Sequence, residues 1–431
     1  MSTLDGVIAR ASERLGYSAL RPNQYKAIKS FLEGKDVFVA LPTGSGKSLC
    51  FAILPFAFDD MYGRVGSIAL IVSPLKALMK DQVSSLSSRG LSAAYVNGET
   101  ENDKSQLTEI LNGKFHIIFI SPELLLTNLT WREMIRTRTY MNNLVAFVVD
   151  EAHCIPKWGQ YFRNEFSKLG EVRSLIPSHV KIMTMTATAT KDTTKKVISI
   201  LGMDNPIIVA ATPDKANVFY CVREHRGSIE EVFGPVLKRL QTERTQMGRL
   251  IVYCRRCEEC ASIYEYFLSS LKHEFTEPIA APNQSEFRLI DMYTSITEKD
   301  VQDTIISSFC QASAPLRIVV CTIAFGMGLD CVDVKEVIHW GPAPDLESYM
   351  QECGRAGRNG QFSDALLYVK CSDLKKVSKE MKEYCLNKSE CRRALLCSYF
   401  DCDRLSVTGC SCCDICARSC ACSNCNHTIL F

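Results

Sequence analysis

The segment that most constrains the fold of this chain is residues 41–48, with the sequence LPTGSGKS. An apolar run (residues 36–41) leads into it, and an apolar run compatible with a helix (residues 49–58) follows it. When a strand, a glycine turn and a helix follow one another in this way, backbone N–H groups at the positive end of the helix bind phosphate. The sequence therefore predicts a nucleotide-binding loop, with Leu41 standing where the strict pattern has glycine.

The residue types in this loop divide the work of binding ATP and Mg²⁺. Lys47 is expected to reach the β- and γ-phosphates, and the Ser48 hydroxyl is expected to hold Mg²⁺. The residues expected to surround the phosphates are Thr43, Gly44, Ser45 and Gly46. The alternative is a glycine turn that only precedes an amphipathic helix.

The size and composition of the chain favour a folded protein with two or three domains. Its 431 residues are 46% hydrophobic and 23% charged, a balance that does not indicate disorder. The formal net charge of +2 does not by itself indicate a nucleic-acid partner, so such binding would need a local groove. The sequence contains no run of 18 apolar residues and no N-terminal signal segment, which predicts a soluble intracellular protein without a membrane partner.

Apolar, strand-like runs alternate with helical stretches along two successive parts of the chain. The runs are residues 36–41, 68–73, 116–121, 144–150 and 180–186, and then residues 249–254, 289–293, 316–322, 334–340 and 365–369. Continuous apolar strands separated by helices are typical of parallel sheets buried on both faces. We therefore predict an α/β fold with domains at residues 1–212 and 213–371, followed by a cysteine-rich region at residues 372–431.

An acidic pair follows the predicted strand that ends at residue 149. Asp150 and Glu151 open the sequence DEAH (residues 150–153). Downstream of a phosphate-binding loop, this pair suits ATP hydrolysis: Asp150 would bind Mg²⁺ through water, and Glu151 would orient or deprotonate the attacking water. An ordinary acidic strand end with a helix cap explains either motif alone, but it explains the two together poorly.

Four segments together resemble the motifs of one family. They are residues 15–24 (LGYSALRPNQ), 150–153 (DEAH), 321–330 (CTIAFGMGLD) and 351–358 (QECGRAGR). With these segments the chain resembles the RecQ family of superfamily 2 DNA helicases over nearly its whole length. The resemblance implies two tandem RecA-like parallel-sheet domains followed by a small helical zinc-binding subdomain.

Residues 15–24 are similar to the adenine-reading motif of this family. Gln24 offers both a donor and an acceptor to the edge of adenine, and Tyr17 and Arg21 can sandwich its ring. The alternative is a helix start with a polar face, although the spacing to Lys47 favours adenine.

The resemblance also places three residues of the second domain at the nucleotide. Gln351, Arg355 and Arg358 belong to helicase motif VI, and the arginines would reach the γ-phosphate from the other domain. An arginine in this role can raise the rate of hydrolysis by about 10³–10⁵. Hydrolysis would then require the two domains to close. The alternative is a flexible basic loop.

Further segments are expected to contact nucleic acid. In the family, residues matching 73–82 and 121–123 line a single-strand track, and residues matching 154–163 (CIPKWGQYFR) form an aromatic loop that stacks on unpaired bases. Gln160 stands where the family has His, so the signal from bound DNA to the ATP site is expected to be weakened or rerouted. The expected contacts are Ser73, Lys76, Trp158, Tyr161, Phe162, Arg163 and Thr322.

The 22 cysteines are unevenly distributed, and eleven of them lie between Cys385 and Cys425. In an intracellular ATPase, such a cluster indicates a metal before it indicates disulfides. The resemblance to the RecQ zinc subdomain implies a structural Zn²⁺ with four thiolate ligands: Cys391, Cys410, Cys413 and Cys416. Residues 420–427 (CACSNCNH) are either a second partial metal site or a reactive cysteine-rich end.

The predicted function is that of an ATP- and Mg²⁺-dependent DNA helicase. It would translocate on single-stranded DNA and unwind forked duplexes, with a 3′→5′ direction implied by the resemblance alone. Two alternatives stay open: an RNA-dependent ATPase, and a nucleic-acid-binding scaffold that does not hydrolyse ATP. The expected location is the nucleus in a eukaryote and the cytoplasm otherwise.

Overall fold

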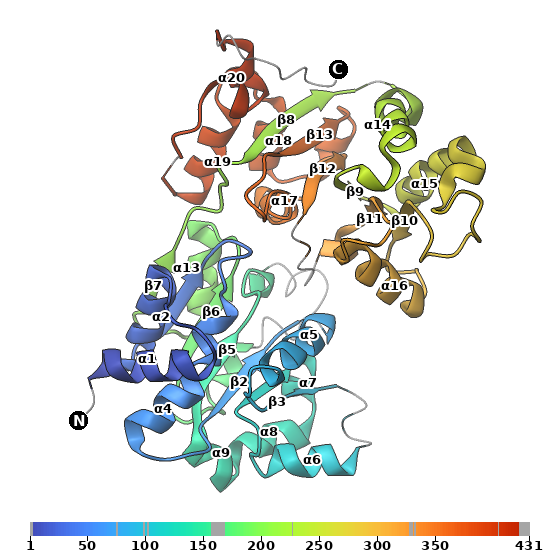
Figure 1. Cartoon of the computed structure of the whole chain (residues 1–431). Helices are drawn as coiled ribbons and strands as arrows, with labels where there is room; N and C mark the ends of the chain where they lie inside the picture. The colour runs from blue at the N-terminus through green and yellow to red at the C-terminus, as the bar shows by residue number, and fades with distance from the viewer. Residues whose placement is uncertain are drawn as a thin grey trace. The chain divides into compact units, whose positions relative to one another are not determined.

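The computed structural model divides the chain into two compact units, Met1–Ala211 and Thr212–Phe431. It describes residues 3–74, 76–97, 100, 103–156, 169–225, 227–326, 331, 333–403 and 405–421. Each unit is built on a parallel β-sheet with helices packed against it (Figure 1). The predicted α/β class with two parallel sheets is confirmed.

The first unit contains a seven-stranded sheet with the order β3-β4-β2-β5-β6-β1-β7. Its strands are β1 (Val37–Ala40), β2 (Ile68–Val72), β3 (Ala93–Val96), β4 (Ile117–Ile120), β5 (Leu144–Val149), β6 (Lys181–Thr186) and β7 (Ile207–Ala210). All neighbouring strands are parallel, with Val37 of β1 opposite Met183 of β6. The five predicted strands are present, and β3 and β7 are additional.

Short helices precede β1 and connect the strands in the described part of the first unit. They are α1 (Leu4–Arg14), α2 (Pro22–Leu32), α3 (Ser48–Ala52), α4 (Leu54–Tyr62), α5 (Lys76–Ser87), α6 (Lys104–Leu111), α7 (Pro122–Thr127), α8 (Leu129–Arg136), α9 (Arg138–Asn143), α12 (Leu169–Val172) and α13 (Lys191–Ile200). Among the described residues of the chain, the helices lack the combination of length and apolarity that a membrane span needs.

The second unit contains a six-stranded sheet with the order β10-β11-β9-β12-β13-β8. Its strands, again all parallel to their neighbours, are β8 (Val218–Glu224), β9 (Arg249–Cys254), β10 (Ile290–Tyr293), β11 (Ile318–Cys321), β12 (Val334–Trp340) and β13 (Ser363–Val369). Its α-helices are α14 (Ile229–Glu243), α15 (Cys257–Leu271), α16 (Lys299–Cys310), α17 (Leu346–Cys353), α18 (Lys379–Leu386), α19 (Arg392–Phe400) and α20 (Asp414–Arg418). Its 3₁₀ turns are η1 (Arg244–Gln246), η2 (Lys272–Phe275), η3 (Ile323–Gly326), η4 (Asp373–Lys376) and η5 (Gly409–Ser411).

Alternate residues of each strand fill two hydrophobic cores, one on each face of the sheet. In β1, Val37 and Val39 belong to one core and Phe38 to the other. In β9, Leu250 and Ile251 are divided between two cores in the same way. Because successive side chains of a strand point to opposite faces, uninterrupted apolar runs give sheets that are buried on both sides.

The cysteine-rich region packs at the edge of the second sheet (Figure 1). Leu396 and Phe400 of α19 share a core with Val218 and Tyr220 of the edge strand β8. A backbone bridge also joins Tyr220 to Cys413. Helix α19 of the predicted zinc-binding subdomain therefore packs against the edge strand of the second sheet.

One buried carboxylate ties together three strands of the first unit. Asp36, which precedes β1, is 1% exposed. One of its carboxylate oxygens accepts the N–H of Ile182 (2.8 Å), and the other accepts the N–H of Asp204 (2.8 Å). Its carbonyl oxygen accepts the N–H of Ile207 (2.8 Å). Asp36 therefore links the start of β1 to β6 and to the segment that leads into β7.

We expect Asp36→Ala to destabilise the first unit by roughly 2–3 kcal/mol, because a buried N–H donor loses its acceptor. Asp36→Asn keeps one acceptor oxygen and should cost less. The measurement is hydrogen exchange of peptides that cover β1 and β6. Asp192→Ala, which removes an exposed ion pair with Lys196, is the matched control and should leave this exchange unchanged. Equal effects of Asp36→Ala and Asp192→Ala would contradict the prediction.

Candidate functional site

Residues 41–48 connect the end of β1 to the start of α3 in the first unit. Gly44 and Gly46 have φ angles of 82° and 74°, in the region that favours glycine. A Cβ atom at Gly46 would lie 2.6 Å from the side-chain nitrogen of Gln24, so a larger residue here would displace that side chain from the loop. The Lys47 ammonium donates to the carbonyl oxygens of Leu41 (2.9 Å) and Pro42 (3.3 Å), which holds it over the loop.

Two of the residues predicted to read adenine contact this loop directly. The amide of Gln24 donates to the carbonyl oxygens of Ser45 (3.1 Å) and Gly46 (3.0 Å), and Arg21 donates to that of Gly44 (3.1 Å). The Gln24 side-chain oxygen in turn accepts the N–H of Arg21 (2.9 Å). The segment before α2 and the glycine loop thus form one hydrogen-bonded unit. The third predicted residue, Tyr17, is half-buried against the core of the first unit.

The acidic pair lies at the carboxyl end of β5. The N–H of Asp150 donates to the carbonyl oxygen of Val72 (2.9 Å), and the N–H of Glu151 donates to the Asp150 carboxylate (2.9 Å). Burial, followed by the charge of Glu151, raises the pKa of Asp150 to about 7, whereas the positive charge of Lys47 acts in the opposite direction. The ammonium of Lys47 and the carboxylates of Asp150 and Glu151 are therefore close enough for their charges to interact.

His153 extends the site to a second strand. Its Nδ1 atom lies 3.3 Å from the Glu151 carboxylate and 3.1 Å from the hydroxyl oxygen of Thr186, at the end of β6. The Thr186 hydroxyl donates to the carbonyl oxygen of Thr188 (2.8 Å). These contacts connect the DEAH sequence to the Thr-Ala-Thr segment at residues 186–188. The sequence motif contains His153, but its contact with Thr186 depends on the neighbouring positions of β5 and β6 in the sheet.

The residues expected to contact nucleic acid lie at several strand ends. Ser73 is buried after β2, where its N–H donates to the carbonyl oxygen of Ile120 (3.0 Å), and Lys76 begins α5. Thr322 follows β11 of the second unit, where its N–H donates to the carbonyl oxygen of Tyr293 (3.3 Å). Four of the expected contacts, Trp158, Tyr161, Phe162 and Arg163, lie outside the described residues, as does Gln160.

The motif VI residues form a positively charged cluster in the second unit. Gln351 belongs to α17, and Arg355 and Arg358 lie in the turn that follows it. The ammonium of Lys215 donates to the carbonyl oxygens of Gly354 (2.6 Å) and Ala356 (2.9 Å) in this turn. Burial is the main cause that lowers the pKa of Lys215 to about 8, and Arg358 and Arg355 lower it further. Three cationic side chains thus lie close enough to repel one another, and an anion would relieve this repulsion.

Lys215 and Asn217 belong to this cluster, although no sequence motif indicates them. The amide of Asn217 donates to the carbonyl oxygens of Gly357 (2.8 Å) and Gln361 (2.7 Å). Both residues precede β8, and motif VI precedes β13. Because β8 pairs with β13, the two segments are neighbours at the start of these strands. The only signal available in the sequence was the pair of polar residues at the boundary between the two domains.

Four thiols converge at the edge of the second sheet. The sulfur atoms of Cys391, Cys412, Cys413 and Cys416 all lie within 4.8 Å of one another. The Cys391–Cys412 and Cys391–Cys413 separations are 3.6 and 4.0 Å, close to the separation of about 3.8 Å that tetrahedral Zn–S bonds require. Thus four soft ligands are arranged as a structural zinc site needs them.

The ionisation of these thiols also favours a bound cation. A hydrogen bond from Cys412 lowers the pKa of Cys413 to about 4, whereas burial and the contacts with Cys391 and Cys413 raise the pKa of Cys416 to about 12. The thiols therefore oppose one another's ionisation. A metal cation would allow all four to be deprotonated.

The structure differs from the predicted ligand set at one position. Cys412, not Cys410, joins Cys391, Cys413 and Cys416. Cys410 lies within the 3₁₀ turn η5 (Gly409–Ser411) and Cys412 directly follows it; Gly409 in this turn has a φ angle of 63°. As a result Cys412 is buried against the cluster, whereas Cys410 is partly exposed. The even Cys-x₂-Cys spacing in the sequence does not reveal this turn.

Two consecutive arginines hold the cluster in place. Arg392 makes a bidentate ion pair with Asp414 (2.5 and 2.9 Å), and both side chains are buried. Arg393 is fully buried, forms an ion pair with Asp214 and donates to the carbonyl oxygen of Val218 (2.6 Å). The first arginine therefore orders the turn that carries Cys413 and Cys416, and the second attaches α19 to the start of β8.

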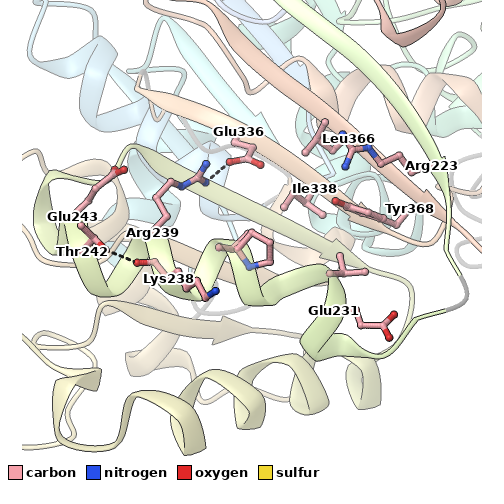
Figure 2. Close-up of a pocket in the computed structure, with 13 residues that line it drawn as sticks. Arg223, Glu231, Lys238, Arg239, Thr242, Glu243, Glu336, Ile338, Leu366 and Tyr368 are labelled. Atoms are coloured by element: carbon pink, nitrogen blue, oxygen red, sulfur yellow. Dashed lines mark hydrogen bonds and ion pairs between the residues drawn. The ribbon is translucent and has the colours of Figure 1, made fainter. Parts of the chain in front are cut away.

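A cavity of about 540 Å³ lies elsewhere in the second unit, between α14 and the strands β8, β12 and β13 (Figure 2). Ile338, Leu366 and Tyr368 contribute apolar surface to it, and the ion pair between Arg239 and Glu336 flanks it. Its lining residues are different from those of motif VI and of the thiol cluster. The cavity is therefore separate from the candidate site.

The raised pKa of Asp150 predicts a pH dependence of stability in metal-free protein. The ordinary pKa of this carboxyl group is 3.8, so between about pH 4 and 7 the folded chain holds a proton that the unfolded chain releases. The free energy of unfolding of the first unit should therefore fall as the pH rises through this window, by about 1.4 kcal/mol for each tenfold difference in proton affinity between the folded and the unfolded chain. Hydrogen exchange of a peptide covering β5, at pH 5 and pH 8 with chelator, measures it.

Asp150→Asn is the matched control for this titration. The variant cannot ionise at residue 150, so its stability should fall less between pH 5 and pH 8 than that of the original chain. An identical pH dependence in both proteins would contradict the assignment of the titration to Asp150.

Comparisons with known proteins agree with this arrangement of motifs. The family model for DEAD/DEAH box helicases matches residues 21–197, and that for the helicase conserved C-terminal domain matches residues 233–360. Among solved structures, the helicase Lhr of Mycobacterium smegmatis bound to single-stranded DNA and AMP-PNP has a TM-score of 0.66 at 21% identity. That likeness covers 93% of this chain and 51% of the Lhr chain.

Three relatives have closer sequences. The chain is 31% identical to the ATP-dependent DNA helicase RecQ of Haemophilus influenzae (93% of this chain, 62% of the relative). It is 30% identical to the ATP-dependent helicase SGS1 of Saccharomyces cerevisiae (96% and 28%) and to the ATP-dependent DNA helicase Q1 of Rattus norvegicus (88% and 60%).

The chain thus spans between about a quarter and two thirds of the length of these relatives. Both helicase family models match it in the expected order, one in each compact unit. Most of its length also aligns with RecQ-type proteins from a bacterium, a yeast and a mammal. The chain therefore carries the two domains of a superfamily 2 helicase and is a homologue of RecQ-type helicases over most of its length.

Proposed function

We propose that this chain is an ATP-dependent DNA helicase that moves along single-stranded DNA and separates forked duplexes. The observation that carries the proposal is the meeting of Lys47, Asp150 and the Gln24 amide around one glycine loop of the first unit. The relatives are named ATP-dependent DNA helicases, which favours DNA over RNA as the partner. Translocation in the 3′→5′ direction rests on the family resemblance.

Within the first unit, each side chain has a proposed task in hydrolysis. Ser48 and Asp150 would hold Mg²⁺, which when bound neutralises charge on the phosphates. Glu151 would orient the attacking water and accept its proton, with its carboxylate positioned by His153. The loop residues Thr43, Gly44, Ser45 and Gly46 would bind the phosphates, and Tyr17, Arg21 and Gln24 the adenine.

Within the second unit, we assign an anion-binding role to motif VI. Lys215 keeps the turn that carries Arg355 and Arg358 attached to its own unit, and the three cations repel one another. The γ-phosphate is the anion that family resemblance indicates, with Gln351 positioning water or phosphate beside it. A contribution of Arg358 to the rate of about 10³–10⁵ is expected for this role.

The proposed DNA contacts are divided between the units. Ser73 after β2, Lys76 at the start of α5 and Thr322 after β11 would contact the phosphates. Trp158, Tyr161 and Phe162 would stack on bases of the single strand, and Arg163 would neutralise its charge. This mode of binding tolerates any sequence. The nucleus of a eukaryotic cell, or otherwise the cytoplasm, is the proposed location.

We further propose that the four convergent thiols bind a structural Zn²⁺. Four thiolate ligands leave no open position for catalysis. Zinc would link α19, through Cys391 at its start, to the turn of residues 412–416. Its proposed task is to keep the edge of the second sheet folded.

We expect Lys47→Ala to reduce DNA-stimulated ATP hydrolysis at least about a hundredfold, because the phosphate charge loses its ammonium partner. The fold should persist, since the hydrogen bonds of Lys47 to Leu41 and Pro42 join residues of the same loop. A steady-state phosphate-release assay measures the loss. Lys35→Ala, at an exposed lysine one strand away, is the control and should keep full turnover. Retained turnover in Lys47→Ala would refute the loop assignment.

Comparing nucleic acids tests the proposed partner. ATP hydrolysis should rise more with single-stranded DNA than with RNA of the same length and sequence, and strand separation should be measured on forked and blunt duplexes with the same preparation. Stronger stimulation by RNA would favour the RNA-dependent ATPase. Nucleic-acid binding without any hydrolysis would favour the scaffold.

We expect Cys412→Ser to lose bound zinc and Cys410→Ser to retain it, because only Cys412 lies within the thiol cluster. A structural zinc can contribute about 10–16 kcal/mol to local folding, so Cys412→Ser should also expose α19 and α20 to hydrogen exchange. Zinc content by atomic emission gives the stoichiometry. Zinc lost from Cys410→Ser but kept in Cys412→Ser would restore the ligand set predicted from the Cys-x₂-Cys spacing.

A further inference from the structure

Two cysteines outside the thiol cluster meet at the end of α19. The helix ends at Asp401, which has left-handed backbone angles (φ 52°, ψ 48°). The N–H of Asp401 donates to the carbonyl oxygen of Ser398 (3.3 Å), and the N–H of Cys402 donates to that of Cys397 (3.0 Å). This pair of bonds is the Schellman arrangement, which commonly brings the side chains at these two positions into contact. Here both positions are cysteines.

The two thiols have different environments. Cys397 is buried and Cys402 is partly exposed. Interaction with the Cys397 thiol is the main cause that lowers the pKa of Cys402 to about 7. A hydroxyl hydrogen bond from Thr212 (3.2 Å) acts in the same direction, whereas burial and the charges of Asp214 and Asp403 act against it. An accessible, partly ionised thiol therefore has a buried partner thiol beside it.

We propose that Cys397 and Cys402 form a redox-active dithiol that hydroperoxides oxidise reversibly to a disulfide. The Schellman hydrogen bonds at the helix end place Cys402 beside Cys397, and neither residue belongs to the thiol cluster of the metal centre. This site goes beyond the proposed helicase function and does not depend on it.

The oxidation is a two-electron reaction in two steps. The Cys402 thiolate attacks one peroxide oxygen; the O–O bond breaks, the alkoxide leaves and takes a proton as an alcohol, and a sulfenic acid forms. The Cys397 sulfur then attacks the Cys402 sulfur, expels hydroxide, and its thiol proton converts this hydroxide to water. Overall, two thiols and one hydroperoxide give one disulfide, one alcohol and one water. A dithiol reductant reverses the reaction by thiol–disulfide exchange.

The dithiol contacts the first residues of the second unit. Thr212, which donates to the Cys402 sulfur, is the first residue of this unit, and its hydroxyl accepts the N–H of Asp214 (3.2 Å). Asp214 is ion-paired with the buried Arg393 of α19. A disulfide removes the thiolate acceptor of Thr212. Oxidation should therefore loosen the attachment of residues 212–214 to α19.

The sequence allows a direct test by peptide mapping. Trypsin releases residues 394–404 (ALLCSYFDCDR), which contain Cys397 and Cys402 and no other cysteine. Protein treated with limiting hydrogen peroxide, alkylated and digested should yield this peptide lighter by two hydrogen atoms and unalkylated. The exposed Cys310 and Cys371 serve as internal references, and the disulfide should form at least about tenfold faster than either is oxidised. Recovery of the doubly alkylated peptide when the references are already oxidised would overturn the proposal.

Two variants separate the roles of the thiols. In Cys402→Ser, the buried Cys397 should stay reduced; in Cys397→Ala, Cys402 should be trapped as sulfenic acid by a dimedone probe. Equal oxidation of Cys397 with and without Cys402 would contradict the attack by Cys402.

Hydrogen exchange at residues 212–214 should rise on oxidation of the original chain and not of Cys397→Ala, and unchanged exchange would overturn the link to these residues. Zinc content measured on the same samples should stay constant, because the dithiol is separate from the metal centre.

Discussion

Parallel pairing of the strands underlies the arrangement of the candidate nucleotide site in the first unit. In a parallel sheet the carboxyl ends of all strands lie at one edge, so loops that are far apart in the sequence meet there. The glycine loop after β1, the acidic pair after β5 and Thr186 at the end of β6 meet at this edge of the first unit. The apolar runs of the strands therefore fill the core and also bring these functional side chains to one edge of the sheet.

Hydrogen bonds from the polypeptide itself hold the candidate nucleotide site in its arrangement. Gln24 and Arg21 donate to carbonyl oxygens of the glycine loop, and Lys47 donates to two others. Asp150 is buried and its ionisation is disfavoured, so a cation bound beside it would stabilise the ionised carboxylate. The same reasoning applies to the repelling cations around Lys215 and to the four thiols. Each is a group of like charges or competing ionisations that a bound partner of opposite charge would satisfy.

Charged side chains also integrate the cysteine-rich region with the second sheet. Arg392 and Arg393 are adjacent in the sequence and on α19, yet they bind carboxylates from two different segments, Asp414 and Asp214. Breaking a buried pair of this kind leaves an uncompensated charge, which is strongly destabilising. The metal centre, the edge strand β8 and the dithiol at the end of α19 are consequently connected through one helix.

Features that are local along the chain could be predicted from the order of the residues alone. The glycine loop at residues 41–48, the DEAH segment, motif VI and ten strands are contiguous patterns, and their chemistry follows from which residues stand next to one another. Three further strands, β3, β7 and β8, were not predicted. All three lie at the edge of a sheet and pair with a neighbour on one side only.

Contacts between distant residues, in contrast, became visible only in the folded chain. The turn η5 selected Cys412 in place of Cys410, the pairing of β8 with β13 brought Lys215 and Asn217 to motif VI, and the end of α19 joined Cys397 to Cys402. These contacts depend on how a backbone turns and on which strands become neighbours. Both are settled by the packing of whole elements, which the identity of single residues does not encode.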